Sequence, residues 1–126
     1  MTRRRVNAKP SADADARTRG AASTALRRLS VDLSRYASGG EEDPEALRLV
    51  PEAVRWAQER AVRVIAEAGR SPVWLRAYAE DARRWAGATA GGDRHSAGLL
   101  AVFLDRLRRE IRRDARPWVV DSGSDK

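Results

Sequence analysis

Apolar side chains recur at every third or fourth position along most of this chain. In the first such segment, residues 21–37, they share one face of a helix: Ala22, Leu26, Leu29, Leu33 and Tyr36. This spacing is typical of an amphipathic α-helix packed on a core. The stretch Ser-Gly-Gly at 38–40 ends the pattern, because glycine favours the conformation that follows a helix end.

Prolines mark the beginnings of the next helices. Asp43-Pro44 is a favourable start, with Asp as the cap and Pro in the first turn. Pro51 lacks the backbone N–H that a helix interior requires. The sequence therefore predicts a short helix over 44–49, a break, and a long helix over 51–68.

Two further helices are predicted from the same signals. Ser71-Pro72 begins one that runs to about residue 86, and Asp93 caps one over 94–115, which Pro117 stops. The first carries an aromatic strip of Trp74, Tyr78 and Trp85, which is most simply interpreted as core.

No strand-like alternation of any length interrupts this pattern. We therefore expect an all-α fold, a small antiparallel bundle of about four helices over 21–116, with a disordered basic arm over 1–20 and a flexible tail over 117–126. The alternative is a looser three-helix core with the first helix detached or used to dimerise. The side chains expected to be buried are Leu26, Leu33, Val54, Ile65, Leu75, Tyr78, Phe103, Leu104 and Leu107.

The chain is basic, with 25 Lys and Arg residues against 18 Asp and Glu residues and a formal net charge of +7. Nearly all the basic residues are Arg, which a GC-rich coding sequence would also produce, so the choice of Arg over Lys says little about function. The net excess says more, because it favours an acidic partner.

Basic residues gather in two places. Residues 1–40 hold nine basic and three acidic residues, with a cluster at the start consisting of Arg3, Arg4, Arg5 and Lys9. On the last predicted helix a spacing of 3, 4 and 3 aligns a second cluster, the Arg ridge, consisting of Arg106, Arg109, Arg113 and Arg116. Each cluster suits contact with phosphates. The alternative for the cluster at the start is a solubilising tail, and the alternative for the Arg ridge is a solvated face with internal ion pairs, which is what a run of charges usually forms.

The sequence contains no recognisable arrangement of catalytic residues. The chain has no Cys and a single His, His95, which stands alone in a polar helix start. Neighbouring carboxylates such as Glu80 and Asp81 fall on different faces of a helix and do not converge. We expect no enzyme activity, no metal and no cofactor.

No apolar run approaches the roughly 20 residues that span a bilayer, and no apolar segment follows the basic start as in a signal peptide. The expected location is cytoplasmic.

Two tryptophans stand outside the apolar pattern. Trp56 lies on the polar side of its predicted helix, and Trp118 follows Pro117. Trp56 either packs under the first helix, the more common outcome where a helix is covered on two sides, or marks an interface, and Trp118 is open to the same two interpretations. Since Trp is enriched where proteins meet, both are candidates for protein contact.

These features lead to two hypotheses. The first is a non-catalytic binding protein whose acidic partner is nucleic acid, held without sequence preference through the Arg clusters. The second is a small adaptor or assembly subunit that docks on a partner protein through its helices, as a homodimer or within a larger complex.

Overall fold

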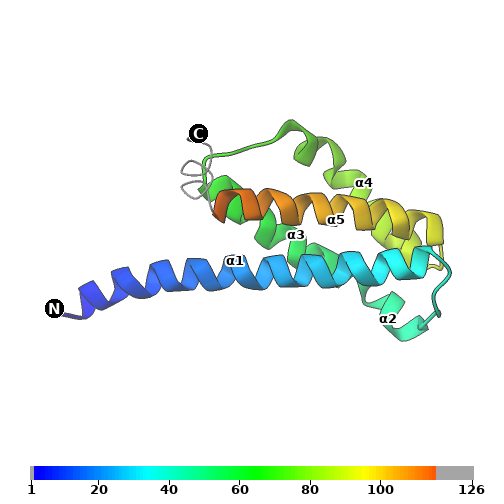
Figure 1. Cartoon of the computed structure of the whole chain (residues 1–126), viewed down its shortest axis with the longest axis horizontal. Coiled ribbons are helices and arrows are strands. Elements are labelled where there is room, and N and C mark those ends of the chain that lie inside the picture. The colour runs from blue at the N-terminus through cyan, green and yellow to red at the C-terminus, as the bar shows by residue number, and fades with distance from the viewer. Residues whose placement is uncertain (1, 116–126) are drawn as a thin grey trace, which may run out of the picture.

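The computed structural model describes the backbone of residues 2–115 and the side chains of Arg17 and residues 19–112. Within this range it contains five helices and no strand (Figure 1). They are α1 (Thr2–Ala37), α2 (Pro44–Arg48), α3 (Val50–Glu67), α4 (Val73–Ala90) and α5 (Arg94–Ala115). The predicted all-α fold is confirmed.

The four long helices form an antiparallel bundle. α1 packs on α3 and α5, and α4 packs on the same two helices from the other side, while α3 and α5 also touch across the centre. The pairing of α1 with α5 is the most extensive in the molecule, so the alternative with a detached first helix is wrong. The small helix α2 lies against α3 and α4.

Local sequence signals set most helix ends. Asp43 caps α2 by accepting hydrogen bonds from the backbone N–H of Glu45 and Ala46. Three glycines with positive φ follow the ends of α1, α3 and α4, namely Gly39, Gly69 and Gly92. After each of them, the next residue donates its N–H to a carbonyl five positions back in the helix, which satisfies a carbonyl that would otherwise be orphaned.

The break predicted at Pro51 is confirmed. α2 ends at Arg48, Leu49 lies outside both helices, and Pro51 stands in the first turn of α3. Proline has no N–H to bond to the carbonyl of Leu47. The N–H of Leu49 instead closes a tighter turn on the carbonyl of Ala46 at 3.1 Å.

Two boundaries differ from the predicted ones. α4 continues to Ala90, past the predicted end at residue 86, so Gly87 does not end the helix; Thr89 in the added turn is buried, and its hydroxyl donates to the carbonyl of Trp85 at 2.7 Å. α1 begins at Thr2 rather than near residue 21, in a segment rich in Ala and Arg, which favour helix. Because the side chains of residues 1–16 lie outside the description, the flexible arm stays a prediction.

The core matches the predicted apolar faces with one exception. Eight of the nine side chains expected to be buried are buried, whereas Tyr78 is 44% exposed. Its neighbours Trp74 and Trp85 are only partly buried against the core. Placing the aromatic strip in the core was therefore wrong for Tyr78: the strip runs along the edge of α4 that meets α5, and Ala82 and Ala86 fill the centre.

None of the described helices is both long enough and apolar enough to cross a membrane.

Phe103 is a buried aromatic side chain of α5 that packs against α4. It is 5% exposed and meets the Trp74 ring edge-on at 6.1 Å between centroids. We expect Phe103→Ala to lower the free energy of unfolding by about 3–5 kcal/mol, measured by urea denaturation. A decrease below about 1 kcal/mol, on the order of a surface substitution, would contradict this packing.

Gly87 offers a gain in stability. It lies inside α4, is exposed, and a Cβ at this position would meet no atom within 4 Å. Gly87→Ala should raise the free energy of unfolding by about 0.5–1 kcal/mol because alanine loses less backbone entropy in a helix. The matched control is Gly92→Ala, which should be destabilising because Gly92 has φ 103°.

Candidate functional site

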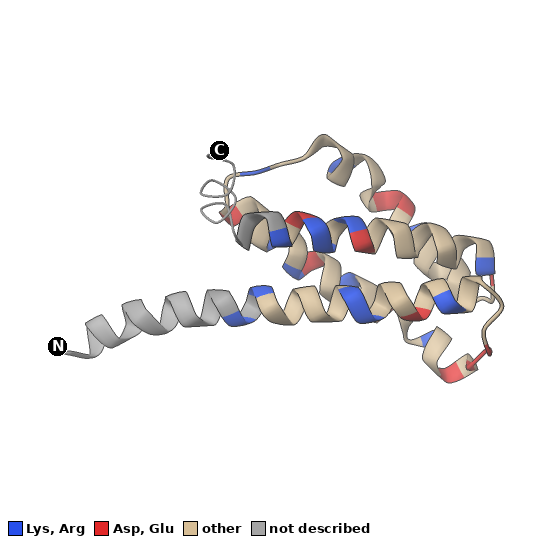
Figure 2. Cartoon of the chain, viewed as in Figure 1, with Lys and Arg blue, Asp and Glu red and all other residues tan. Residues whose placement is uncertain are grey.

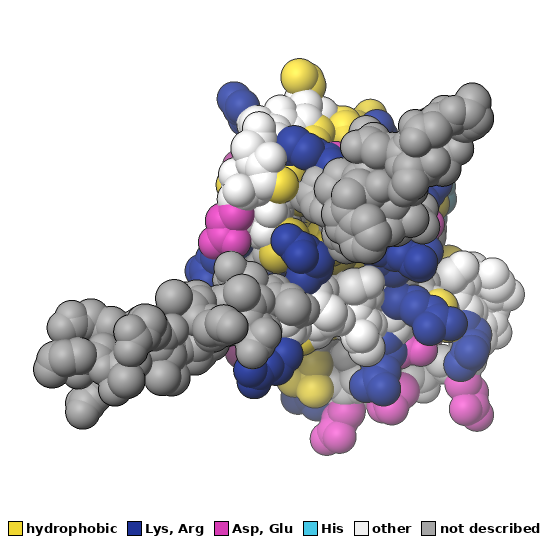
Figure 3. Space-filling view, turned by 60° about the vertical axis from the view of Figure 1, so that its left-hand side comes forward, with side chains coloured by type: hydrophobic (Ala, Val, Ile, Leu, Met, Phe, Trp, Pro, Cys, Tyr) yellow, Lys and Arg dark blue, Asp and Glu magenta, His cyan; other side chains and the backbone are white. Residues whose placement is uncertain are grey.

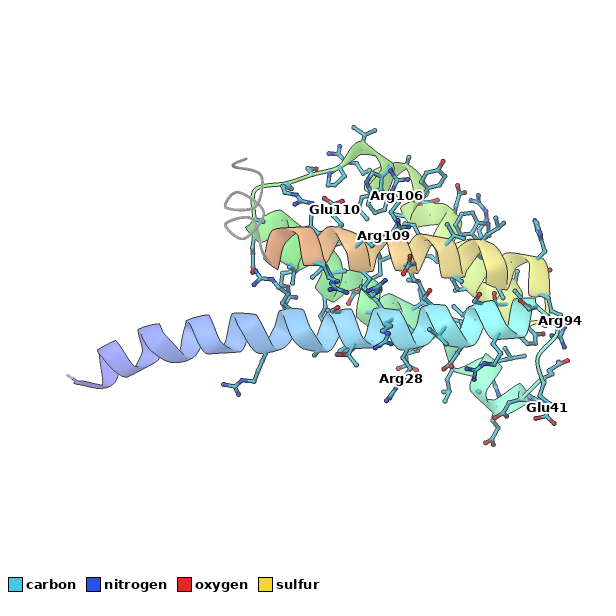
Figure 4. All side chains as sticks on the ribbon, in the orientation of Figure 1. Arg28, Glu41, Arg94, Arg106, Arg109 and Glu110 are labelled. Atoms are coloured by element: carbon cyan, nitrogen blue, oxygen red, sulfur yellow. The ribbon has the colours of Figure 1, made fainter. Side chains whose placement is uncertain are left out.

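The seam between α1 and α5 is fixed at one end by Arg94. Its guanidinium donates to the carbonyls of Tyr36 at 2.5 Å and Gly40 at 2.9 Å, and lies 4.2 Å from the centroid of the Tyr36 ring (Figure 4). A cation at this position also offsets the partial negative charge at the C-terminal end of α1. Further along the seam, the Ser30 hydroxyl donates to the carbonyl of Ala101 at 3.2 Å.

This register brings arginines of both helices together. Because α1 and α5 are antiparallel, each turn back along α1 from Ser30 matches a turn forward along α5 from Ala101. Arg27 is therefore level with Leu104, beside Asp105, and Arg109 follows a little more than one turn further along α5. Just over two turns back from Arg27, Arg19 is level with Arg112. We call the resulting surface the basic face: Arg19, Arg27, Arg108, Arg109 and Arg112. Arg28 is excluded, because it points away from α5 (Figure 4).

The basic face carries a net positive charge. Asp105 bridges two of its members, Arg108 at 2.9 Å and Arg109 at 3.2 Å, and the Arg109 side chain is still 65% exposed. No carboxylate among the described side chains pairs with Arg27 or Arg112. Figure 2 shows the basic segments of α5 next to those of α1, and Figure 3 shows basic side chains gathered along α1 and above it.

Only two members of the predicted Arg ridge have described side chains, and their surroundings differ. Arg109 belongs to the basic face, while Arg106 lies on the other side of α5, with its guanidinium 4.2 Å from the centroid of the Trp74 ring. The remaining predicted contacts lie outside the described side chains: Arg3, Arg4, Arg5, Lys9, Arg113, Arg116 and Trp118.

Arg27 was missed at the sequence level. It lies on the exposed, polar side of its helix, and only the packing of α5 against α1 shows that arginines of α5 lie on the same side of the bundle. The sequence carries no signal for that neighbour beyond the short loops, which favour antiparallel pairs without saying which helices become adjacent.

Trp56 is exposed, so the more common outcome expected for it, packing under the first helix, is not the one found. Its exposed fraction is 40%, and the Arg60 guanidinium lies 4.0 Å from its ring centroid. The stacked arginine covers part of the indole, and the rest faces solvent. Its role in protein contact stays a prediction.

His95 lies in the first turn of α5, where Asp93 caps the helix. Asp93 accepts from the backbone N–H of His95 at 3.1 Å and from the Ser96 hydroxyl at 2.7 Å. The bond from Ser96, supported by the backbone N–H donors, lowers the pKa of Asp93 against the opposing effect of burial. Among the described residues no group of three or more His, Cys, Asp or Glu side chains is arranged to hold a metal ion.

Comparisons with models of protein families, with curated proteins and with solved structures find no match.

The lowered pKa of Asp93 predicts a pH dependence of stability. A carboxyl whose pKa is lower in the folded state stabilises the fold above its unfolded-state pKa, and this contribution is lost as the pH falls through the folded-state pKa. Asp93→Asn keeps a capping side chain but removes the charge. We expect its melting temperature to lie below that of the wild type at neutral pH, and the two to converge in acid. A difference that stays constant down to the acid limit would contradict the assignment.

Proposed function

We propose that the chain is a non-catalytic binding protein whose partner is acidic, namely nucleic acid bound without sequence preference at the basic face. The observation that carries this proposal is the antiparallel seam, along which α1 and α5 present five arginines; among the described side chains Asp105 pairs with two of them, Arg108 and Arg109. A surface potential of one sign raises the local concentration of oppositely charged partners.

Phosphates suit this surface better than isolated carboxylates do. Arginine presents a planar fork of donors that matches phosphate oxygens, and the basic face offers these forks along two neighbouring helices. Backbone phosphates recur regularly along a nucleic acid, so one strand supplies several partners and releases several condensed counterions. Arginine contacts of this kind position a protein on nucleic acid without reading bases.

The adaptor hypothesis keeps one specific observation in its favour, the exposed Trp56 stacked with Arg60. Tryptophan and arginine are both enriched at energetically important protein contacts. In that case a partner protein would bury the remaining indole surface, and the arginines of the basic face would serve solubility.

A matched pair of triple variants tests the proposal. The first, Arg27→Gln with Arg109→Gln and Arg112→Gln, removes three charges from the basic face. The control, Arg55→Gln with Arg63→Gln and Arg83→Gln, removes three exposed charges from the groove between α3 and α4. Gln preserves helix propensity, so both variants should fold.

Fluorescence anisotropy with labelled oligonucleotides across a salt series should distinguish the two variants. We expect only the first variant to bind weakly. The slope of its plot of log K against log salt should be less steep, by about 0.9 for each duplex phosphate that the protein no longer neutralises. Asp105→Asn should act in the opposite direction and tighten binding. Equal decreases in affinity for the two triple variants would show that net charge alone matters; no binding by the wild type at low salt would overturn the proposal.

A further inference from the structure

An aromatic strip runs along the side of α4 that faces α5. It consists of Trp74, Tyr78 and Trp85. The Tyr78 ring stacks on Trp85, with 6.5 Å between centroids and 27° between planes, and the residue is 44% exposed. Stacking holds the phenol in place on the surface without burying it.

The facing part of α5 is apolar and exposed. Trp74 touches Phe103 and Arg106, so the antiparallel register places Tyr78 one turn further back along α5, level with Leu99 and Val102. Val102 is 66% exposed, and Leu99 is also exposed. Exposed aromatic and aliphatic side chains that lie close together are a candidate binding surface.

The strip lies next to the basic face. α5 borders the basic face on its α1 side and the aromatic strip on its α4 side, and Arg109 lies on its outer surface between the two. A helix with its side chains is roughly 10–12 Å wide, so both surfaces are within reach of one extended strand. Arg106, 4.2 Å from the centroid of the Trp74 ring, brings a positive charge into the strip itself.

We infer that the ligand is single-stranded nucleic acid, with bases stacked on Tyr78 and beside the Arg106–Trp74 pair while Arg27, Arg109 and Arg112 hold phosphates. This inference rests on the proposed function. Aromatic side chains accept any base, because every base has a π-face, and arginine adds cation–π attraction. A duplex keeps its bases stacked inside the helix, so it can use the basic face but not the strip.

A second copy of the chain is the competing occupant of the strip, and charge disfavours it. A copy docked on the strip would bring its own Arg106 and Arg109 to the same interface, in a protein that already carries a net charge of +7. Like charges across an interface oppose association. A polyanion meets the same arginines with the opposite charge.

The experiment compares one labelled oligonucleotide of mixed sequence, as a single strand and as a duplex, by anisotropy. The proteins are the wild type, Tyr78→Ala, Tyr78→Phe and, as control, Trp56→Ala, whose side chain is exposed to a similar degree on another surface. We expect tighter binding of the single strand by the wild type. Tyr78→Ala should weaken it about fivefold to a hundredfold, as expected when one base stack is removed, and leave the duplex unaffected. Tyr78→Phe and Trp56→Ala should bind as the wild type does.

Failure of this inference is distinguishable from failure of the proposed function. Equal affinity for single strand and duplex, unchanged by Tyr78→Ala, would overturn the role of the strip and leave the basic face standing. No binding of either form would overturn the proposed function itself. A dimer in sedimentation equilibrium that Tyr78→Ala abolishes without changing nucleic-acid affinity would assign the strip to self-association instead.

Discussion

Arg94 is the residue on which the arrangement of the surface depends. It joins the first turn of α5 to the carbonyl of Tyr36 in the last turn of α1 and to that of Gly40 in the following loop, and it stacks on Tyr36, so it fixes the position of α5 along α1. A shift by one turn, about 5.4 Å, would change which arginines of α5 lie level with Arg19 and Arg27. The carbonyls at a helix end lack partners within the helix, which makes the cation effective at this point.

The rotation of α5 about its own axis is fixed at the other end. Glu110 is buried on the α4 side of α5 and forms an ion pair with Arg70 from the α3–α4 connection (Figure 4). A buried carboxylate that lost its partner would carry a large desolvation cost, so α5 resists turning. This constraint keeps the basic residues toward α1 and the apolar residues Leu99 and Val102 toward solvent beside α4.

The sequence was sufficient for most helix ends and for nearly all the core, because caps, prolines and apolar spacing are local signals. It was insufficient where a side chain lies between two helices. Tyr78 sits beside the apolar strip of α4, and whether it is covered depends on how far the neighbouring helix reaches over it. Arg106 and Arg109 look equivalent on a single helix, and only the presence of Trp74 on one side and α1 on the other separates them. Arg27 was missed for the same reason, because the sequence does not show that α5 lies beside its helix.

Charge is distributed unevenly around the bundle, and this decides which side attracts a polyanion. The groove of about 1020 Å³ between α3 and α4 carries carboxylates as well as arginines, with Glu52 and Glu59 beside Arg55, Arg63 and Arg83. Opposite charges at close range weaken the field that reaches into solvent. On the basic face the described side chains set Asp105 alone against five arginines, so its field extends further. A polyanion is therefore drawn toward the α1–α5 side, where the exposed aromatic side chains of α4 stand next to the arginines that would hold it.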